Sequence, residues 1–103
     1  MPKKVSELLL PAAVILKLNS REKSAVIAEL TAPLVTAGLV TSEQEFISAI
    51  MRRENLESTG IGFGVAIPHA RTNAVREAVI AFGRSETGVD FSSLDGKLSH
   101  LIF

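Results

Sequence analysis

Residues 58–71 contain the residue types in this chain that are best suited to chemistry on a proton or a phosphoryl group. Gly60, Gly62 and Gly64 stand at every second position, and the apolar run that follows them leads to His69, one of two histidines in the sequence. Glycine takes backbone angles closed to other residues and can bring main-chain N–H groups close to a ligand. The spacing therefore favours a glycine-rich turn beside a titratable imidazole.

Pro68 stiffens the chain directly before this histidine. Proline fixes its own φ and favours extended backbone at Ile67, so His69 is expected to leave the end of a strand in a defined direction. An imidazole held in this way suits proton transfer or phosphoryl transfer. The alternative is a histidine that is only hydrogen-bonded within the fold, because a single histidine is weak evidence for a site.

The glycine pattern does not match the common phosphate-binding loops. A dinucleotide fingerprint needs glycine or alanine where this chain has Val65, and the Gly-Lys-Ser/Thr of a Walker loop is missing. Nucleotide binding by either route is therefore not expected. The glycines are also consistent with a tight turn and a bulge before a strand, with no ligand involved.

Other histidine chemistries lack their usual partner residues. His69 has no spaced histidine, cysteine or carboxylate cluster that would form a metal site, and no Gly-x-Ser-x-Gly element supplies a serine nucleophile. What remains is the histidine itself as nucleophile, with an arginine such as Arg53 or Arg71 neutralising an anionic group. Alternatively, Arg52 and Arg53 could only stabilise the C-terminal end of a helix, where positive charge interacts favourably with the helix dipole. His100 is expected to have a structural or incidental role.

Composition limits the class of protein. The 103 residues form one domain, 1–103, of ordinary globular composition, with 47% apolar and 21% charged residues. Eleven basic and eleven acidic side chains cancel, so neither nucleic acid nor an anionic membrane surface is favoured as a partner. The absence of cysteine fits a reducing compartment. Pro11 and Lys17 interrupt the first apolar stretch, so neither a signal peptide nor a membrane span is expected, and the cytoplasm is the default location.

The hydrophobic pattern alternates between strand and helix, which predicts an α/β fold. In the first half we expect a helical turn at 6–10 capped by Ser6 and closed by Pro11, and a strand at 12–18. A helix capped by Ser20 is expected to run from Arg21 to a stop at Gly38, with Ile27, Leu30, Leu34 and Ala37 on its buried face and a kink or early end at Pro33.

A second helix is expected to begin at a capping box formed by Thr41 and Gln44 and to end near Arg53. Its inward stripe is Phe46, Ile47, Ile50 and Met51. Beyond the glycine-rich stretch we expect a helical turn at 72–77, a strand at 78–82, a polar and turn-rich segment at 83–96, and a strand at 98–103.

Three segments of this sequence closely resemble the signature of a known family. Arg53-Glu54, Ser58-Thr59-Gly60-Ile61-Gly62 and Val65-Ala66-Ile67-Pro68-His69-Ala70 are similar to the fructose/mannitol-type enzyme IIA domain of the bacterial phosphoenolpyruvate-dependent sugar phosphotransferase system. Residues 88–97 and 100–103 also look like this family. The resemblance covers nearly the whole chain, and it implies a mixed β-sheet flanked by helices.

The resemblance also implies a function and roles for individual residues. His69 would take a phosphoryl group from phospho-HPr and pass it to an enzyme IIB domain, so the protein would be a phosphotransferase system component with a phosphohistidine intermediate. Arg53 would steady the phosphoryl group. Phosphoryl transfer needs alignment and charge neutralisation more than covalent machinery, so no metal or organic cofactor is required. The residues expected to line the phosphoryl pocket are Thr59, Gly60, Gly62 and Gly64.

Two departures from the family pattern stand out. Phe63 occupies a position where asparagine is frequent in the family. Family domains also usually continue further and carry a second histidine near the active one, and His100 does not match its position. We therefore expect the chain to lack the C-terminal part of the domain, which would leave an incomplete sheet that favours self-association.

The same motif also occurs in the nitrogen-regulatory branch of the family, whose members are thought to signal through phosphorylation-dependent protein binding. Regulation is therefore the alternative to sugar uptake. The identity of a sugar is not encoded here, because a IIA domain never touches the sugar. The exposed Nε2 of His69 is the expected phosphorylation site.

Overall fold

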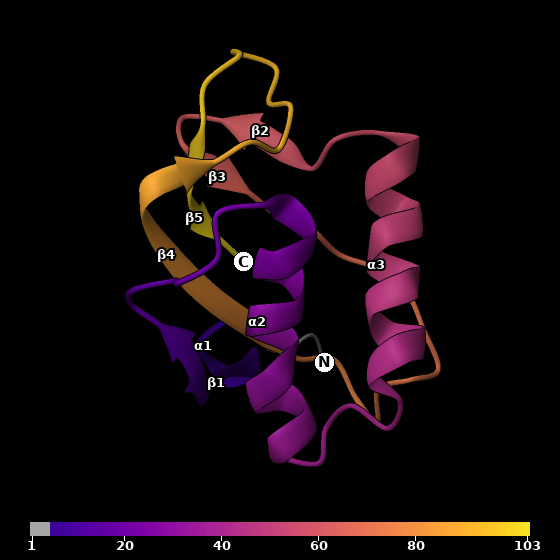
Figure 1. Ribbon diagram of the computed structural model, residues 1–103. Helices are drawn as coiled ribbons and strands as arrows, with labels where there is room; N and C mark the ends of the chain where they lie inside the picture. The colour runs from indigo at the N-terminus through magenta and orange to yellow at the C-terminus, as the bar shows by residue number, and fades with distance from the viewer. Residues whose placement is uncertain (1–4) are drawn as a thin grey trace.

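A computed structural model of the chain describes residues 5–103, with side chains from residue 7 onward. Its five-stranded sheet has the order β1-β4-β5-β3-β2, and the helix α2 lies across one face of the sheet with α3 beside it (Figure 1). The pairs β1–β4 and β3–β5 are parallel, whereas β4–β5 and β2–β3 are antiparallel. The α/β prediction, a mixed sheet flanked by helices, is confirmed. The elements are α1 (Val5–Leu8), β1 (Leu9–Ile15), α2 (Lys23–Thr36), α3 (Glu43–Leu56), β2 (Gly60–Gly62), β3 (Val65–Ala66), β4 (Ile80–Val89) and β5 (Ser99–Ile102).

The first strand begins earlier than expected. The helical turn α1 ends at Leu8, and β1 already includes Pro11, which was predicted to close the helix. Pro11 is tolerated because β1 is an edge strand with an irregular register between Leu9 and Val14, so its missing N–H breaks no central ladder. The expected cap Ser6 lies outside the described side chains.

The helix α2 begins two residues later than predicted and passes through its proline. Its N-cap is Glu22, without a side-chain cap, and the expected cap Ser20 lies before the helix, where its backbone N–H donates to the Glu29 carboxylate at 2.9 Å. Pro33 does not end the helix, which continues to Thr36 and stops before Gly38 as expected. Three of the four predicted face residues are buried, namely Ile27, Leu30 and Leu34, whereas Ala37 lies beyond the helix and is exposed.

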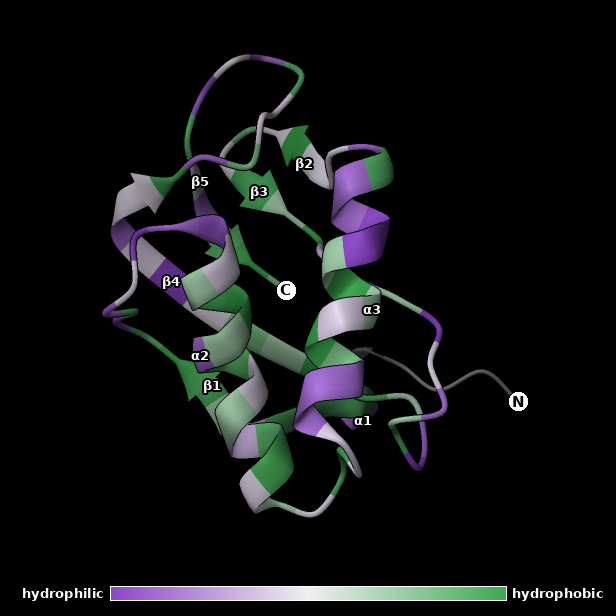
Figure 2. Ribbon diagram, turned by 45° about the vertical axis from the view of Figure 1, so that its right-hand side comes forward, coloured by the Kyte–Doolittle hydropathy of each residue, from purple (hydrophilic) through white to green (hydrophobic). Residues whose placement is uncertain are grey.

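The helix α3 is capped one residue later than predicted. Its N-cap is Ser42, whose hydroxyl accepts a hydrogen bond from the N–H of Glu45 at 3.3 Å, in place of the expected pair Thr41 and Gln44. Ile50 is buried, and the other members of the expected stripe are partly buried. Hydrophilic residues gather toward both ends of α3, and its middle is more apolar (Figure 2).

Two predictions for the second half are wrong. Residues 72–77 do not form a helical turn, because Val75 pairs with Val40 and the N–H of Thr41 donates to Ala74 at 2.7 Å. The strand expected at 78–82 instead runs from residue 80 to residue 89, since polar residues continue it: Ser85 is buried in the sheet, whereas Arg84 and Glu86 are exposed. The last strand, expected at 98–103, is present as β5.

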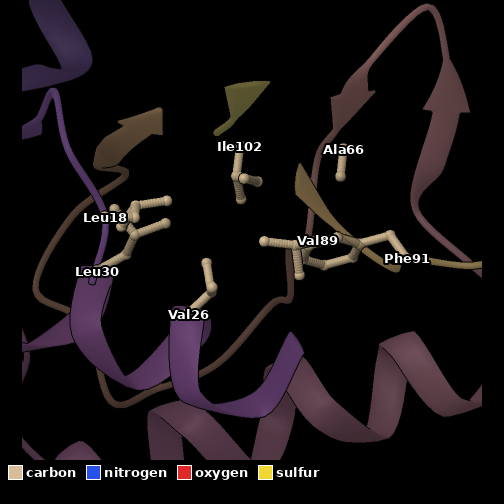
Figure 3. Close-up of a cluster of buried hydrophobic side chains, with 7 residues drawn as sticks. All are labelled: Leu18, Val26, Leu30, Ala66, Val89, Phe91 and Ile102. Atoms are coloured by element: carbon tan, nitrogen blue, oxygen red, sulfur yellow. The ribbon is translucent and has the colours of Figure 1, made fainter. Parts of the chain in front are cut away.

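The main core lies between α2 and the sheet. Figure 3 shows its seven buried side chains, which come from α2, β3, β4, β5 and the segments beside them: Leu18, Val26, Leu30, Ala66, Val89, Phe91 and Ile102. This core fixes β3 against α2 and so sets where the chain leaves β3. Within residues 5–103 no helix has the length and apolar character needed to cross a membrane.

Candidate functional site

His69 lies three residues beyond β3 and is exposed. Its Nδ1 atom is 2.7 Å from the carbonyl oxygen of Ile67. A carbonyl oxygen only accepts, so Nδ1 carries the proton in this contact, and in the neutral ring the lone pair lies on Nε2. The local backbone thus selects one tautomer and leaves one nitrogen free for attack.

The segment that carries His69 borders an apolar cavity of about 600 Å³. Ile67, Pro68 and His69 line it together with Phe46 and Ile50 of α3 and with residues of α2. Figures 1 and 2 both show the chain leaving β3 and passing alongside α3. The histidine is therefore placed next to the helix that carries the candidate arginine.

Arg53 follows Ile50 by one turn of α3 and is partly exposed. One guanidinium nitrogen, Nη1, donates to the carbonyl oxygen of Glu57 at 2.8 Å, which closes the end of the helix. The helix-end role considered for Arg53 is therefore present, and the other N–H groups of the guanidinium have no partner in the described part of the chain. Among residues 5–103 no hydrogen bond joins Arg53 to His69.

Thr59 is buried, and its polar groups are already engaged. Its hydroxyl donates to one oxygen of the Glu54 carboxylate at 2.5 Å, and its N–H donates to the other oxygen at 3.1 Å. The side chain of Thr59 thus faces α3 rather than an open pocket.

The three glycines shape the hairpin formed by β2 and β3. A side chain at Gly60 would meet Ser93 at 2.3 Å, so this position needs glycine for close approach. Gly62 and Gly64 have φ values of +92° and +76°, which form the tight, irregular turn expected from the sequence. Phe63 lies at the tip of this turn and is 96% exposed.

Gly62 and Gly64 do not border the cavity that His69 borders. They line a separate open hollow together with Asp95 and His100. The structure thus brings His69 to the side of α3, and it places the turn of the hairpin at the other end of β3.

Asp95 is a residue that the sequence reasoning missed. Its carboxylate accepts hydrogen bonds from the backbone N–H groups of Lys97 at 3.0 Å and Phe63 at 3.1 Å, and these bonds lower the pKa of Asp95 from its ordinary value. The carboxylate therefore joins the hairpin turn to the loop before β5. Its place in the turn-rich Ser93–Lys97 segment was the available signal.

Glu54 was also missed as a site residue. Only 3% of its surface is exposed, and Lys23 of α2 approaches its carboxylate at 3.4 Å. The signal was present in the sequence, because Glu54 lies four residues after Ile50 and so continues the inward stripe of α3.

His100 resembles His69 in its local geometry. It is exposed, and its Nδ1 atom is 2.9 Å from the carbonyl oxygen of Ser85. Among the described residues no group of three or more histidines, cysteines or carboxylates is placed to hold a metal ion.

Comparison with known proteins identifies the family. The family described as "Phosphoenolpyruvate-dependent sugar phosphotransferase system, EIIA 2" matches residues 7–103. The chain is 48% identical over 100 residues to the fructose-specific EIIABC component of the phosphotransferase system of Bacillus subtilis, which covers 97% of this chain but only 16% of the relative. It is also 31% identical over 101 residues to a nitrogen regulatory protein of Bradyrhizobium diazoefficiens, covering 96% of this chain and 64% of the relative.

Solved structures agree with this relationship. The nitrogen regulatory protein IIA-Ntr of Neisseria meningitidis superimposes with a TM-score of 0.84 at 35% identity, covering 96% of this chain and 67% of that protein. The Escherichia coli complex of the mannitol enzyme IIA with phosphorylated enzyme IIB gives a TM-score of 0.69 at 25% identity, covering 92% of this chain and 68% of its counterpart. The chain belongs to the EIIA 2 family of the phosphoenolpyruvate-dependent sugar phosphotransferase system.

Proposed function

We propose that this protein is a phosphocarrier in which the Nε2 atom of His69 accepts a phosphoryl group from phospho-HPr and passes it to an enzyme IIB domain. The observation that carries the proposal is the hydrogen bond from Nδ1 to the carbonyl oxygen of Ile67, since it leaves the lone pair on Nε2. In the first step this lone pair forms the N–P bond while the bond from phosphorus to its donor breaks. In the second step the acceptor on enzyme IIB displaces the phosphoryl group and the neutral imidazole is restored.

Arg53 supplies positive charge for the transferred group. Its guanidinium is held at one nitrogen by Glu57, and the opposite edge of the fork suits a bidentate contact with phosphoryl oxygens. Because the transferring group carries its charge on oxygens, a fixed cation lowers the barrier without a proton transfer. The contact between Arg53 and the phosphoryl group forms only when the group is present.

The four residues first expected to line the pocket have a supporting role in this proposal. Thr59 bonds to Glu54, and Gly60 packs against Ser93, so both shape the connection between α3 and β2. Gly62 and Gly64 set the hairpin turn that precedes β3. None of them is needed as a direct ligand of the phosphoryl group.

Two relatives support the choice of the acceptor. The E. coli mannitol enzyme IIA forms a complex with phosphorylated enzyme IIB. The B. subtilis relative joins A, B and C components in one polypeptide by name. We propose a IIB domain as the acceptor, HPr as the donor and the cytoplasm as the place where they meet, with no metal or organic cofactor.

Labelling with phosphoenolpyruvate, enzyme I and HPr tests the proposal. The protein should gain one acid-labile phosphate, which adding a IIB domain should remove. His69→Ala should abolish labelling, and His100→Ala is the matched control, because this second exposed histidine has the same contact to a backbone carbonyl. Unchanged labelling of His69→Ala would contradict the assignment.

A second candidate function is phosphorylation-dependent signalling. The structural likeness to the nitrogen regulatory protein of N. meningitidis, at 35% identity, favours it specifically. Both functions need the phosphohistidine, so the two are distinguished by what happens to the phosphoryl group after His69 has accepted it. A carrier transfers its phosphate to a cognate IIB domain, whereas a regulator keeps the phosphate and binds a different partner in each state.

A further inference from the structure

We propose that Glu54 is a positioning residue that holds both Arg53 and His69 in place through Thr59. This inference rests on the proposed function. Glu54 makes no contact with the phosphoryl group in this account, because the residue is only 3% exposed and its carboxylate accepts hydrogen bonds from Thr59 and Lys23.

Both oxygens of the Glu54 carboxylate accept hydrogen bonds, from Thr59 in the connection that follows α3 and from Lys23 of α2. Oε1 accepts the hydroxyl proton of Thr59 at 2.5 Å. Oε2 accepts the N–H of Thr59 at 3.1 Å and a proton of the Lys23 ammonium at 3.4 Å. A buried carboxylate is costly unless it is paired and hydrogen-bonded in this way, so its geometry is strongly determined.

One branch of this network leads to Arg53. Thr59 ends the short connection between α3 and β2, and the same connection contains Glu57, whose carbonyl oxygen holds the guanidinium of Arg53 at 2.8 Å. Ser58, between these two residues, donates its hydroxyl to the carbonyl oxygen of Phe91. The hydrogen bonds between Thr59 and Glu54 therefore also hold in place the Glu57 carbonyl oxygen that accepts from Arg53.

The other branch leads to His69. The carbonyl oxygen of Thr59 accepts the N–H of Ile67 at 3.0 Å. The carbonyl oxygen of Ile67 in turn accepts Nδ1–H of His69 at 2.7 Å. Glu54 is thus three hydrogen bonds away from the nitrogen that selects the tautomer of His69.

Substitution of Glu54 by glutamine is the direct test. The amide oxygen of glutamine can keep the bond from the Thr59 N–H, but the amide nitrogen cannot accept from the Thr59 hydroxyl, so the hydroxyl bond must reverse its direction or be lost. We expect Glu54→Gln to slow phosphoryl transfer from phospho-HPr by about 10- to 100-fold, because small misplacements of reacting groups cost this much. Thr59→Val, which removes the hydroxyl, should also slow phosphoryl transfer. Thr59→Ser, which keeps the hydroxyl, should transfer the phosphoryl group at close to the wild-type rate. The Thr59 pair keeps the test available if Glu54→Gln fails to fold.

Ser99→Ala is the matched control for the loss of a buried hydroxyl. Ser99 is fully buried in β5, its hydroxyl lies 3.4 Å from that of Ser93, and it contributes no hydrogen bond to either branch. We expect this variant to lower thermal stability without slowing phosphoryl transfer. Equal slowing in Ser99→Ala and Thr59→Val would show that Glu54 and Thr59 act only through general stability, and would overturn the proposal.

The tautomer of His69 provides a readout that does not depend on phosphorylation. Long-range ¹H–¹⁵N NMR should show His69 with its proton on Nδ1 in the wild-type protein, and a mixture of both tautomers in Glu54→Gln. His100 is the internal reference, since its own contact to Ser85 is not part of the network. An unchanged His69 tautomer in the variant would contradict the branch to His69.

A double-mutant cycle tests the branch to Arg53. If Glu54 acts through Arg53, the combined loss of rate in Arg53→Met with Glu54→Gln should be smaller than the product of the two single losses. Losses that multiply would contradict this branch. Failure of the proposed function can be told apart from failure of this inference. If the wild-type protein accepts no phosphate, the proposed function fails, but the His69 tautomer should still differ between the wild-type protein and Glu54→Gln if Glu54 positions His69.

Discussion

The two histidines of the chain hold their imidazole rings in the same way but in different surroundings. Each directs Nδ1 toward a backbone carbonyl oxygen, of Ile67 for His69 and of Ser85 for His100. His69 lies beside α3, which carries Arg53, whereas His100 lies in the hollow near Asp95. At the scale of single residues, the position beside α3, and not the ring contact, distinguishes His69 from His100.

The sequence favoured His69 over His100 for a reason that the structure supports in part. Pro68 and the strand before it predicted an imidazole at a strand end, and His69 does follow β3. The contact between Nδ1 and Ile67 could not be predicted, because it depends on the backbone turn after Pro68. The burial of Glu54 could be inferred from the inward stripe of α3, but its pairing with Lys23 could not, since that pairing depends on how α3 packs against α2.

Asp95 makes a pH-dependent contribution to stability at the residue scale. The N–H groups of Lys97 and then Phe63 lower its pKa in the folded protein from the ordinary value of 3.8. A lowered pKa stabilises the fold above the unfolded value, and this stabilisation is lost as pH falls through the folded value.

Urea unfolding of wild-type protein and Asp95→Asn at a series of pH values measures this effect. The wild-type protein should have the larger free energy of unfolding at neutral pH, and the difference should shrink below about pH 4. A difference that stays constant between neutral and strongly acidic pH would exclude the proposed role of the Asp95 carboxylate.

At the scale of elements, the hairpin of β2 and β3 carries a strained residue at its tip. Phe63 has a φ of 57° and is 96% exposed, so its ring contributes almost no buried surface to offset the cost of this conformation. Asparagine adopts positive φ more readily than phenylalanine. We expect Phe63→Asn to raise the free energy of unfolding by about 0.5–1 kcal/mol, measured in urea.

Phe63→Ala separates backbone strain from the loss of the ring. Alanine removes the ring but has no comparable preference for positive φ, so it should give little or no gain. Equal stabilisation by alanine and asparagine would indicate that removal of the exposed ring, rather than relief of the backbone, is responsible.

Element positions were predicted best where burial is one-sided. The apolar faces of the two long helices were visible in the sequence because Ile27, Leu30 and Leu34 recur at helical spacing. The start of β1 and the length of β4 were not, because Pro11 is acceptable only at a sheet edge and Ser85 reads as polar turn sequence. Both errors concern strands whose neighbours come from distant parts of the chain.

At the scale of the whole molecule, the sheet order brings separate segments to one site. Strand β5 lies between β3 and β4 and pairs with β3. The last residues of the described chain therefore fix the position of β3, and with it the position of the segment that carries His69. The helix α3, which precedes β2 and β3 in the sequence, lines the same cavity as His69 through Phe46 and Ile50. The mixed topology could be named only through the family resemblance, because composition and periodicity predict an α/β fold but no strand order.

The apolar cavity beside His69 also bears on how the whole molecule behaves in solution. Its lining includes Val79, Ala78 and Phe103, and the sheet has two edge strands, β1 and β2. Apolar surface and open edges favour association between copies. We expect concentration-dependent self-association in sedimentation experiments, reduced in Ala78→Glu because this exposed position would place a charge at the cavity. A wild-type protein that stays monomeric at all concentrations would contradict this expectation.

The central claim is that His69 carries the phosphoryl group on Nε2. The most direct measurement is NMR of the ¹⁵N-labelled protein after phosphorylation by phosphoenolpyruvate, enzyme I and HPr. The account predicts that the new N–P bond appears at Nε2 of His69 while the Nδ1–H bond to Ile67 persists. Phosphorylation at Nδ1 of His69, or at His100, would contradict it.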